Sequence, residues 1–158
     1  MSISSRLIER CDPERAFGPL NITGAATAGA WNRMVGHRML IVLQTGAWAG
    51  GSSAITLEQA TAAAGTGNKA LGMTRVWKKT NGLFSEVAVA SNTFDVDTAN
   101  ALYVIEVQSD ELDVNGNYAY VQVKSASPGA NADYLSAYYH HGDLRYGSLL
   151  EDREDAKV

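Results

Sequence analysis

Glycine and lysine cluster at residues 65–72, GTGNKALG, in a spacing typical of loops that bind phosphate. Gly65, Gly67 and Ala70 fit the G-x-G-x-x-G/A pattern of dinucleotide-binding proteins, in which the N-terminus of a following helix faces the pyrophosphate. The residues that follow are instead rich in β-branched and aromatic side chains, which predict a strand. A P-loop is excluded because Lys69 is followed by alanine and not by serine or threonine. The sequence therefore predicts a flexible loop between strands, with no nucleotide or other cofactor bound.

Residues 111–122, ELDVNGNYAYVQ, resemble the calcium-binding loop of an EF-hand. Oxygen-bearing side chains occupy the first, third and fifth positions, and glycine occupies the sixth: Glu111, Asp113, Asn115 and Gly116. The twelfth position should be a bidentate glutamate, but it is the neutral Gln122. Asn-Gly between alternating segments predicts a hairpin turn at 115–116 instead. A weak, partly hydrated cation site among Asp110, Glu111 and Asp113 stays open as an alternative.

The histidines and the single cysteine do not form a catalytic or metal-binding pattern. His140 and His141 are adjacent, so on a strand they point to opposite faces and do not grip one metal ion together. Two histidines that meet across a symmetric interface are favoured over a mononuclear site. Cys11 lies in a polar segment with no base beside it, and we do not expect a nucleophilic thiol.

Two aspartates, Asp95 and Asp97, have the spacing of a carboxylate pair on one face of a strand. Glycosidases use pairs of carboxylates as acid, base or nucleophile. The segment DVDTAN also has the composition of a turn capped by its own side chains. No G-x-S-x-G nucleophile motif occurs. We therefore expect no catalytic residue and no enzymatic activity.

The composition sets limits on the partners. The 158 residues suit one domain, and 46% of them are hydrophobic, which is enough for a core. A formal charge of -4 argues against nucleic acid, which binds basic surfaces. The longest apolar run, residues 39–43, is far shorter than a membrane helix, and no apolar leader is evident at the start. These features predict a soluble protein made in the cytoplasm of its host, with no membrane partner.

The elements that would position these residues are short strands. Seven segments are apolar or alternate between apolar and polar residues: 38–45, 54–61, 73–80, 83–90, 101–108, 118–125 and 134–141. The first is nearly continuous and predicts a strand covered on both faces. Asn81-Gly82 predicts a tight hairpin turn. A helix over 56–65 competes with the second strand. The spacing predicts an all-β, antiparallel sandwich in one domain, either jelly-roll-like or immunoglobulin-like.

We expect three regions along the chain. Residues 1–30 contain a stretch of small residues, PLNITGAATAGA, and predict an extended N-terminal arm. Residues 31–147 hold the strands and form the sandwich domain. Residues 148–158 are mostly charged and predict an acidic tail.

Several segments together resemble a family of small structural proteins of tailed bacteriophages. The matching segments are HRMLIVLQTGAWAGG, ITLEQATAAAGTGNKAL, ELDVNGNYAYVQVK and DLRYG, and the resemblance covers residues 31–147. It implies a virion protein on the capsid surface that decorates or cements the head. Its partners would be the major capsid protein and further copies of itself, as a dimer or trimer.

Such a protein would bind the head lattice through its arm and through aromatic side chains. The candidates for interface residues are Trp31, Trp48, Lys69, Trp77, Tyr138, Tyr139 and His140. Ordinary core packing is the alternative for each aromatic residue. Two other functions stay open: a tail-tube, head–tail connector or head-fibre component, and a carbohydrate-binding sandwich module.

Overall fold

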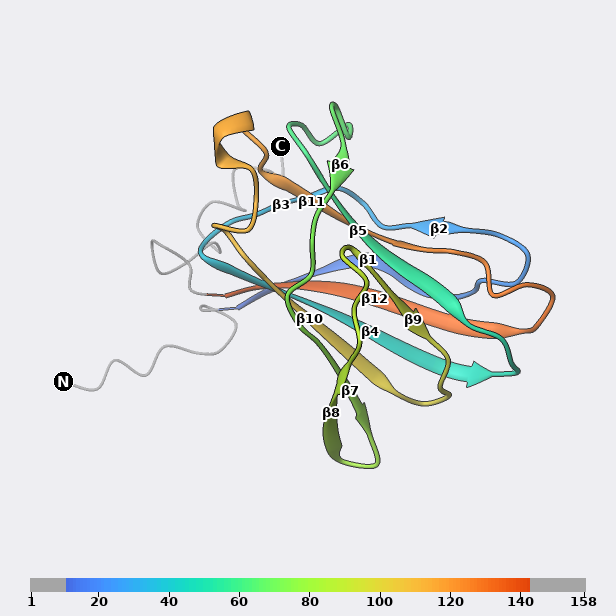
Figure 1. Cartoon of the computed structure of the whole chain (residues 1–158). Helices are drawn as coiled ribbons and strands as arrows, with labels where there is room; N and C mark the ends of the chain where they lie inside the picture. The colour runs from blue at the N-terminus through green and yellow to red at the C-terminus, as the bar shows by residue number, and fades with distance from the viewer. Residues whose placement is uncertain (1–10, 143–158) are drawn as a thin grey trace, which may run out of the picture.

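The computed structural model describes residues 11–142, which form an all-β sandwich of two antiparallel, six-stranded sheets (Figure 1). The strands of sheet A follow the spatial order β1 (Asp12–Asn21), β12 (Asp133–Gly142), β4 (Arg38–Trp48), β10 (Leu102–Gln108), β7 (Val76–Thr80) and β8 (Leu83–Val87). Those of sheet B follow the order β2 (Thr27–Ala28), β11 (Tyr120–Ser125), β5 (Ser53–Ala60) and β6 (Lys69–Ala70). Two further strands complete sheet B: β3 (Asn32–Arg33) pairs with β11, and β9 (Thr93–Val96) pairs with β5.

The strand order is that of a jelly roll. One sheet contains the order β1-β12-β4-β10, and the other sheet places β2 and β3, then β11, β5 and β9, side by side. The chain crosses between the sheets from β4 to β5, from β9 to β10, from β10 to β11 and from β11 to β12. The β7–β8 hairpin is an insertion between β5 and β9 that widens sheet A and projects from the sandwich (Figure 1). Of the two sandwich types predicted, the topology selects the jelly roll.

The core lies between the inner faces of the two sheets. Alternate residues of the central strands point inward and are almost completely buried: Met39, Ile41, Leu43, Tyr103, Ile105 and Val107 from sheet A, and Ile55, Leu57, Val121 and Val123 from sheet B. Successive side chains of a strand point to opposite faces, so each central strand gives one face to this core. Burying each of the large apolar side chains contributes about 1.5–3 kcal/mol.

Most of the predicted strands are confirmed. The segment with a helical alternative is β5, whose residues alternate between more and less buried positions. The Asn81-Gly82 turn joins β7 to β8, with φ angles of 52° and 86°, as a type I′ turn requires. In β10, Tyr103, Ile105 and Val107 are buried together, as the alternation of the sequence predicts.

The expectation that residues 38–45 are covered on both faces is wrong. Burial alternates along β4, so that Leu40 is exposed while Met39 and Ile41 are fully buried. The physical reason is that sheet B covers only one face of sheet A, and no α-helical layer covers the other face within residues 11–142. Half of this apolar run therefore faces outward.

The Asn115-Gly116 turn also differs from the prediction. Residues Val114–Gly116 form a short 3-10 helix, and the left-handed residue is Asn117, with a φ angle of 59°. A tight hairpin is excluded because β10 and β11 belong to different sheets, so the chain must cross the sandwich here. Asp113 caps the turn by accepting a hydrogen bond from the Gly116 amide.

The boundary of the predicted N-terminal arm needs correction. Residues Asp12–Asn21 form β1 at the edge of sheet A, paired with β12 through two register shifts. Phe17 and Ile22 are buried in the core, which anchors this segment to the sandwich. The small residues after Ile22 carry the chain across to β2 in sheet B. Residues 1–10, the end of the predicted domain at 143–147 and the predicted tail at 148–158 lie outside the described residues.

Tyr139 links the two sheets from within the core. Its side chain is fully buried, and its hydroxyl donates to the Ala30 carbonyl (3.0 Å) and accepts from the Val123 amide (3.1 Å). Burial raises the pKa of Tyr139 to about 12. Because the phenol titrates near pH 10 when unfolded, its contribution to stability is complete below pH 10 and is lost as the pH rises from 10 toward 12.

We expect Tyr139→Phe to lower the free energy of unfolding by about 1–3 kcal/mol, because the buried Val123 amide loses its acceptor. Urea unfolding at pH 7 measures this loss. The free energy of unfolding of the unmodified protein should fall between pH 10 and 12. In the variant, which lacks the buried phenol, it should fall less over the same range. Tyr134→Phe, at a position 44% exposed, is the matched control and should change stability little. Equal stability of the two variants would contradict the role given to Tyr139.

Candidate interaction surface

The glycine-rich loop of residues 61–68 uses its own backbone groups internally. The Gly65 amide donates to the Ala62 carbonyl (2.9 Å) and the Asn68 amide donates to the Gly65 carbonyl (3.3 Å). The Thr61 amide and hydroxyl both donate to the Thr66 carbonyl (3.0 Å each). A strand, β6, follows the loop where a nucleotide site would have a helix. The loop therefore lacks the helix N-terminus that would face a phosphate.

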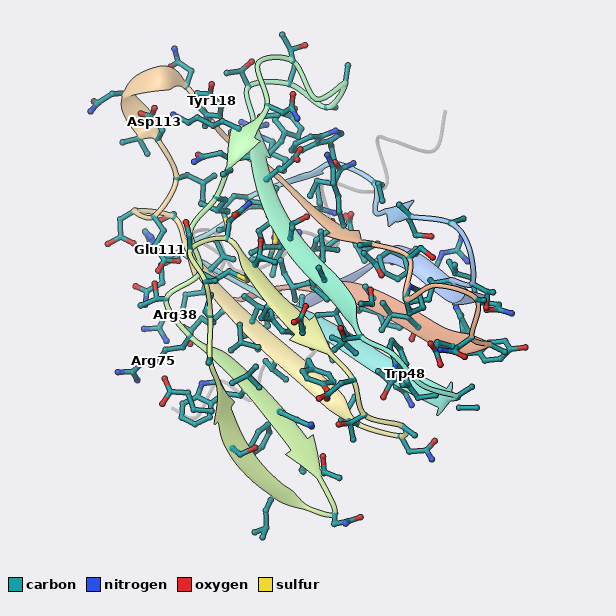
Figure 2. The ribbon with its side chains drawn as sticks, turned by 45° about the vertical axis from the view of Figure 1, so that its right-hand side comes forward. Arg38, Trp48, Arg75, Glu111, Asp113 and Tyr118 are labelled. Carbon is teal, nitrogen blue, oxygen red and sulfur yellow. The ribbon has the colours of Figure 1, made fainter. Side chains whose placement is uncertain are left out.

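Lys69 has its partners within the chain. Its ammonium group pairs with Asp113 and lies 4.2 Å from the centre of the Tyr118 ring. The hydrogen bond between Lys69 and Asp113 raises the pKa of Lys69 and lowers the pKa of Asp113. Tyr118 donates in turn to the Gly67 carbonyl (2.8 Å). Figure 2 shows Asp113 and Tyr118 together at the end of the sandwich near β6. This contact joins the glycine-rich loop to the 3-10 turn.

The carboxylates that resemble an EF-hand loop serve different partners. Glu111 accepts hydrogen bonds from the Gln108 amide (2.9 Å) and from the Thr74 hydroxyl, whereas Asp113 pairs with Lys69. No group of three or more acidic, histidine or cysteine side chains able to hold a metal ion occurs within residues 11–142. Asp143 lies outside that part of the chain.

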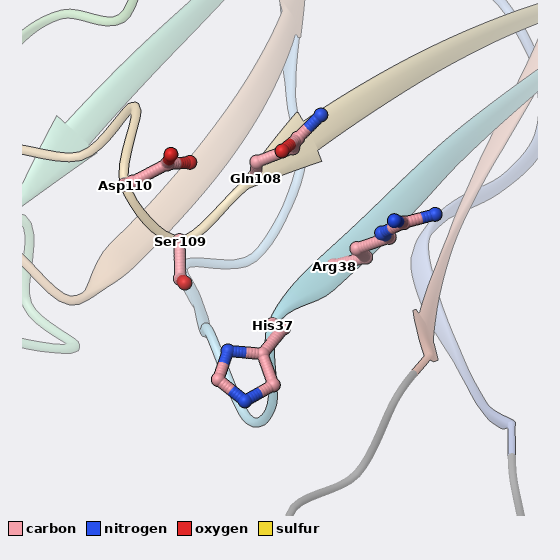
Figure 3. Close-up of a pocket in the computed structure, with 5 residues that line it drawn as sticks. All are labelled: His37, Arg38, Gln108, Ser109 and Asp110. Carbon is pink, nitrogen blue, oxygen red and sulfur yellow. The ribbon is translucent and has the colours of Figure 1, made fainter.

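An open hollow of about 450 Å³ lies where β4 begins and β10 ends, and is lined by His37, Arg38, Gln108, Ser109 and Asp110 (Figure 3). Its residues include the types found in a catalytic triad. Figure 3 shows Asp110 on the far side of Ser109 from His37, and no hydrogen bond joins these three described side chains. The backbone makes the one contact between the segments, from the Ser109 amide to the His37 carbonyl (2.9 Å). The hollow has no activated nucleophile.

A smaller hollow of about 200 Å³ contains Cys11 and His140, with the thiol sulfur 4.0 Å from His140 Nδ1. Burial lowers the pKa of His140, which keeps the ring neutral at neutral pH. A cysteine nucleophile also needs its histidine oriented by a third group. Within residues 11–142, no hydrogen bond orients the other ring nitrogen of His140.

The two aspartates proposed as a carboxylate pair are separated by their surroundings. Asp95 lies on the outer face of β9, between the buried Phe94 and Val96. Asp97 follows the strand, where hydrogen bonds from Thr98 (2.8 Å) and Lys78 (3.2 Å) lower its pKa. Both hydrogen bonds stabilise the ionised carboxylate of Asp97, so Asp97 is unsuited to act as a general acid at neutral pH.

Three of the predicted interface residues lie on the outer face of sheet A: Trp77, Tyr138 and His140. His141, the neighbour of His140, is buried and bonds to Asn32 (2.7 Å), which confirms that the two histidines point to opposite faces. The remaining candidates lie elsewhere. Trp31 packs over the glycine-rich loop at Gly65, Trp48 donates to the Gly51 carbonyl (3.1 Å), and Tyr139 belongs to the core.

The strand register aligns one row of side chains across the outer face of sheet A. Residues opposite each other on neighbouring strands share a face. The row runs from the β1 edge to the β8 edge as Arg15, Tyr138, Val42, Val104, Trp77 and Glu86. Beside it, Leu40 is 40% exposed, Leu102 36% and Phe84 57%. The central row is therefore apolar, with a cation at one edge and an anion at the other, whereas the neighbouring rows also carry Gln44, Lys79 and the Arg38–Glu106 ion pair.

The outer face of sheet B is polar by contrast. Glu58 and Lys124 form an ion pair of 2.6 Å across β5 and β11, and Thr56, Thr93 and Asp95 share the same face. For Glu58, burial raises the pKa, but hydrogen bonds from Lys124 and Asn68 outweigh it and the pKa is lowered. The outer face of sheet A differs by its central apolar row, Tyr138, Val42, Val104 and Trp77, although charged side chains lie on both sides of that row. Exposed apolar side chains that lie next to one another mark candidate interaction sites.

Sequence reasoning missed the centre of this face, Val42 and Val104. Val42 lies in the segment that the sequence predicts to be covered on both faces. Val104 lies in the predicted strand 101–108, for which no exposed apolar face is predicted. The available signal was that Leu102 and Val104 are apolar in the outward register of that strand.

Comparisons with protein-family models, curated proteins and solved structures find no match to this chain. Within residues 11–142, no helix has the length and apolar character needed to cross a membrane.

The contact between Trp31 and the loop gives a test of the loop's structural role. Gly65 has a φ angle of 77°, and a Cβ atom there would lie 2.5 Å from the Trp31 indole nitrogen. We expect Gly65→Ala to lower the free energy of unfolding by about 1–3 kcal/mol, measured by urea unfolding. Gly72→Ala is the matched control, because that position has open space and no left-handed backbone. Equal effects of the two substitutions would contradict the packing of Trp31 on Gly65.

Proposed function

We propose that this chain is a non-enzymatic structural protein of a phage virion, and that it decorates or cements the capsid. The observation that carries the proposal is the apolar row on the outer face of sheet A, in which Trp77 and Tyr138 flank Val42 and Val104. The segments that resemble phage structural proteins supply the setting. Jelly rolls serve in viral capsids and also in lectins, so the fold alone does not choose between these roles.

The chemistry of the described residues supports binding over catalysis. The two hollows have no oriented nucleophile, and Asp97, Glu111 and Asp113 are held by structural hydrogen bonds and ion pairs. A decoration protein needs a stable scaffold and exposed anchors, and weak contacts are multiplied on a symmetric lattice. Aromatic side chains at the centre of a face are the usual anchors of such contacts.

The alternative roles receive less support from the same residues. A tube or connector subunit needs a long hairpin that reaches its neighbour, whereas each strand of the β7–β8 hairpin has five residues. At about 3.3 Å per residue, these strands reach about 17 Å. A sugar-binding platform needs polar groups around an open aromatic ring. Trp48 is held by the loop at Gly51, and Trp77 has the apolar Val104 on one side and a single polar group, Glu86, on the other.

The direct test uses heads of the encoding phage that have been assembled without this protein. Purified protein should co-sediment with these heads to a fixed stoichiometry and raise their temperature of thermal disruption. At a ligand concentration of about 100 times Kd, each site would gain about 2.7 kcal/mol of stability. Heads that already carry the protein are the control and should bind no more. No co-sedimentation at micromolar protein would refute the proposal.

A further inference from the structure

We propose that the outer face of sheet A binds the same face of a second copy of this chain, with a twofold axis parallel to the strands. The inference concerns self-association of the isolated protein, and it does not depend on the virion role proposed above. It rests on the pattern of the row from Arg15 to Glu86, which is complementary to its own reverse.

The twofold operation reverses the row and lays it on the original. The axis passes between β4 and β10, the two central strands of sheet A. Val42 then faces Val104 of the other copy, and Tyr138 faces its Trp77. Within this row, aliphatic residues thus meet at the axis, and aromatic residues meet next to them on both sides. In the neighbouring row, Leu40 faces Glu106 of the other copy, whose carboxylate pairs with its own Arg38. This is the isologous contact of a C2 dimer, in which one patch serves both copies.

The charges at the edges select this orientation. In the reversed row, Arg15 of each copy faces Glu86 of the other, so the dimer gains two oppositely charged pairs at its rim. A twofold axis perpendicular to the strands would instead place Arg15 against Arg15 and Glu86 against Glu86. Like charges that face each other destabilise an interface. The row therefore favours one of the two face-to-face arrangements.

The β7–β8 insertion supplies half of this surface. Trp77 and Glu86 both lie on it, and they match Tyr138 and Arg15 of the jelly-roll strands β12 and β1. Without the hairpin, the row would end at Val104 and its centre would not be complementary to itself. The insertion between β5 and β9 thus gives sheet A the width that the pairing needs.

The expected strength follows from the size of the face. Six strands spaced about 4.8 Å apart give a width of roughly 24 Å, and four rows at a repeat of about 6.8 Å give a length of roughly 20 Å. The planar area is then about 500 Å² per copy, or about 1,000 Å² in total, at the lower end for specific interfaces. We therefore expect a micromolar Kd, set by a small apolar centre and an electrostatic rim.

Sedimentation velocity of the full chain between about 1 and 200 µM tests the proposal, and a monomer–dimer equilibrium is expected in that range. Val104→Lys places a charge at the axis and should leave a monomer throughout. Thr56→Lys puts the same charge on the outer face of sheet B and is the matched control, which should dimerise like the unmodified protein. Circular dichroism and urea unfolding check that both variants fold.

Exchange of the rim charges tests the orientation of the axis. Arg15→Glu or Glu86→Arg alone creates two like-charged pairs, and each should raise Kd about five- to thirty-fold. The double variant Arg15→Glu/Glu86→Arg restores two opposite pairs and should return Kd to within about two-fold of the original. Both positions are exposed, so folding is not at risk.

Three results would overturn the proposal. If the protein is a monomer at every concentration, the proposed dimer is wrong. The proposed virion function would still hold if that monomer binds to phage heads. A dimer that survives Val104→Lys, or that is lost in Thr56→Lys, places the interface elsewhere. Failure of the double charge exchange to restore Kd rejects the axis parallel to the strands.

Discussion

The alternation of side chains along the central strands of sheet A is the constraint on which the rest of the structure depends. Successive residues of β4 and β10 point to opposite faces, and sheet B covers only one of them. A strand in which consecutive residues are all apolar must therefore place every second side chain on the outer face, away from the core. Leu40 and Val42 on β4, and Leu102 and Val104 on β10, are the residues displaced outward in this way.

The polar groups of the described chain act mainly to hold the sandwich together. Tyr139 joins β12 to the backbone of β11, and the buried Asp133 carboxylate accepts from the Ala49 and Gly50 amides at the end of β4. Lys69 and Asp113 connect two loops at the other end of the molecule. These contacts are structural, and none of them lies in the central apolar row on the outer face of sheet A.

The sequence predicted the sandwich from the local signals that depend least on tertiary contacts. Alternation in residues 101–108 and the Asn81-Gly82 turn each specify their structure within a few residues. Asn115-Gly116 carried the same turn signal, but it joins strands of different sheets, and a local pattern does not encode which sheet a strand enters. The strand β1 was also missed, because its register shifts interrupt the alternation. The self-complementary row was not predictable, since it depends on the register of six strands.

The central claim is that the outer face of sheet A is the contact surface of this protein and the outer face of sheet B is not. Hydroxyl-radical footprinting with mass spectrometry measures this directly, as the oxidation rate of single side chains at rising protein concentration. If two copies pair through the outer face of sheet A, Trp77 and Tyr138 become protected together over the concentrations at which the protein associates. Tyr120, at the start of β11 in sheet B, should keep a constant rate. Constant oxidation of Trp77 and Tyr138, or protection of Tyr120 in their place, would contradict it.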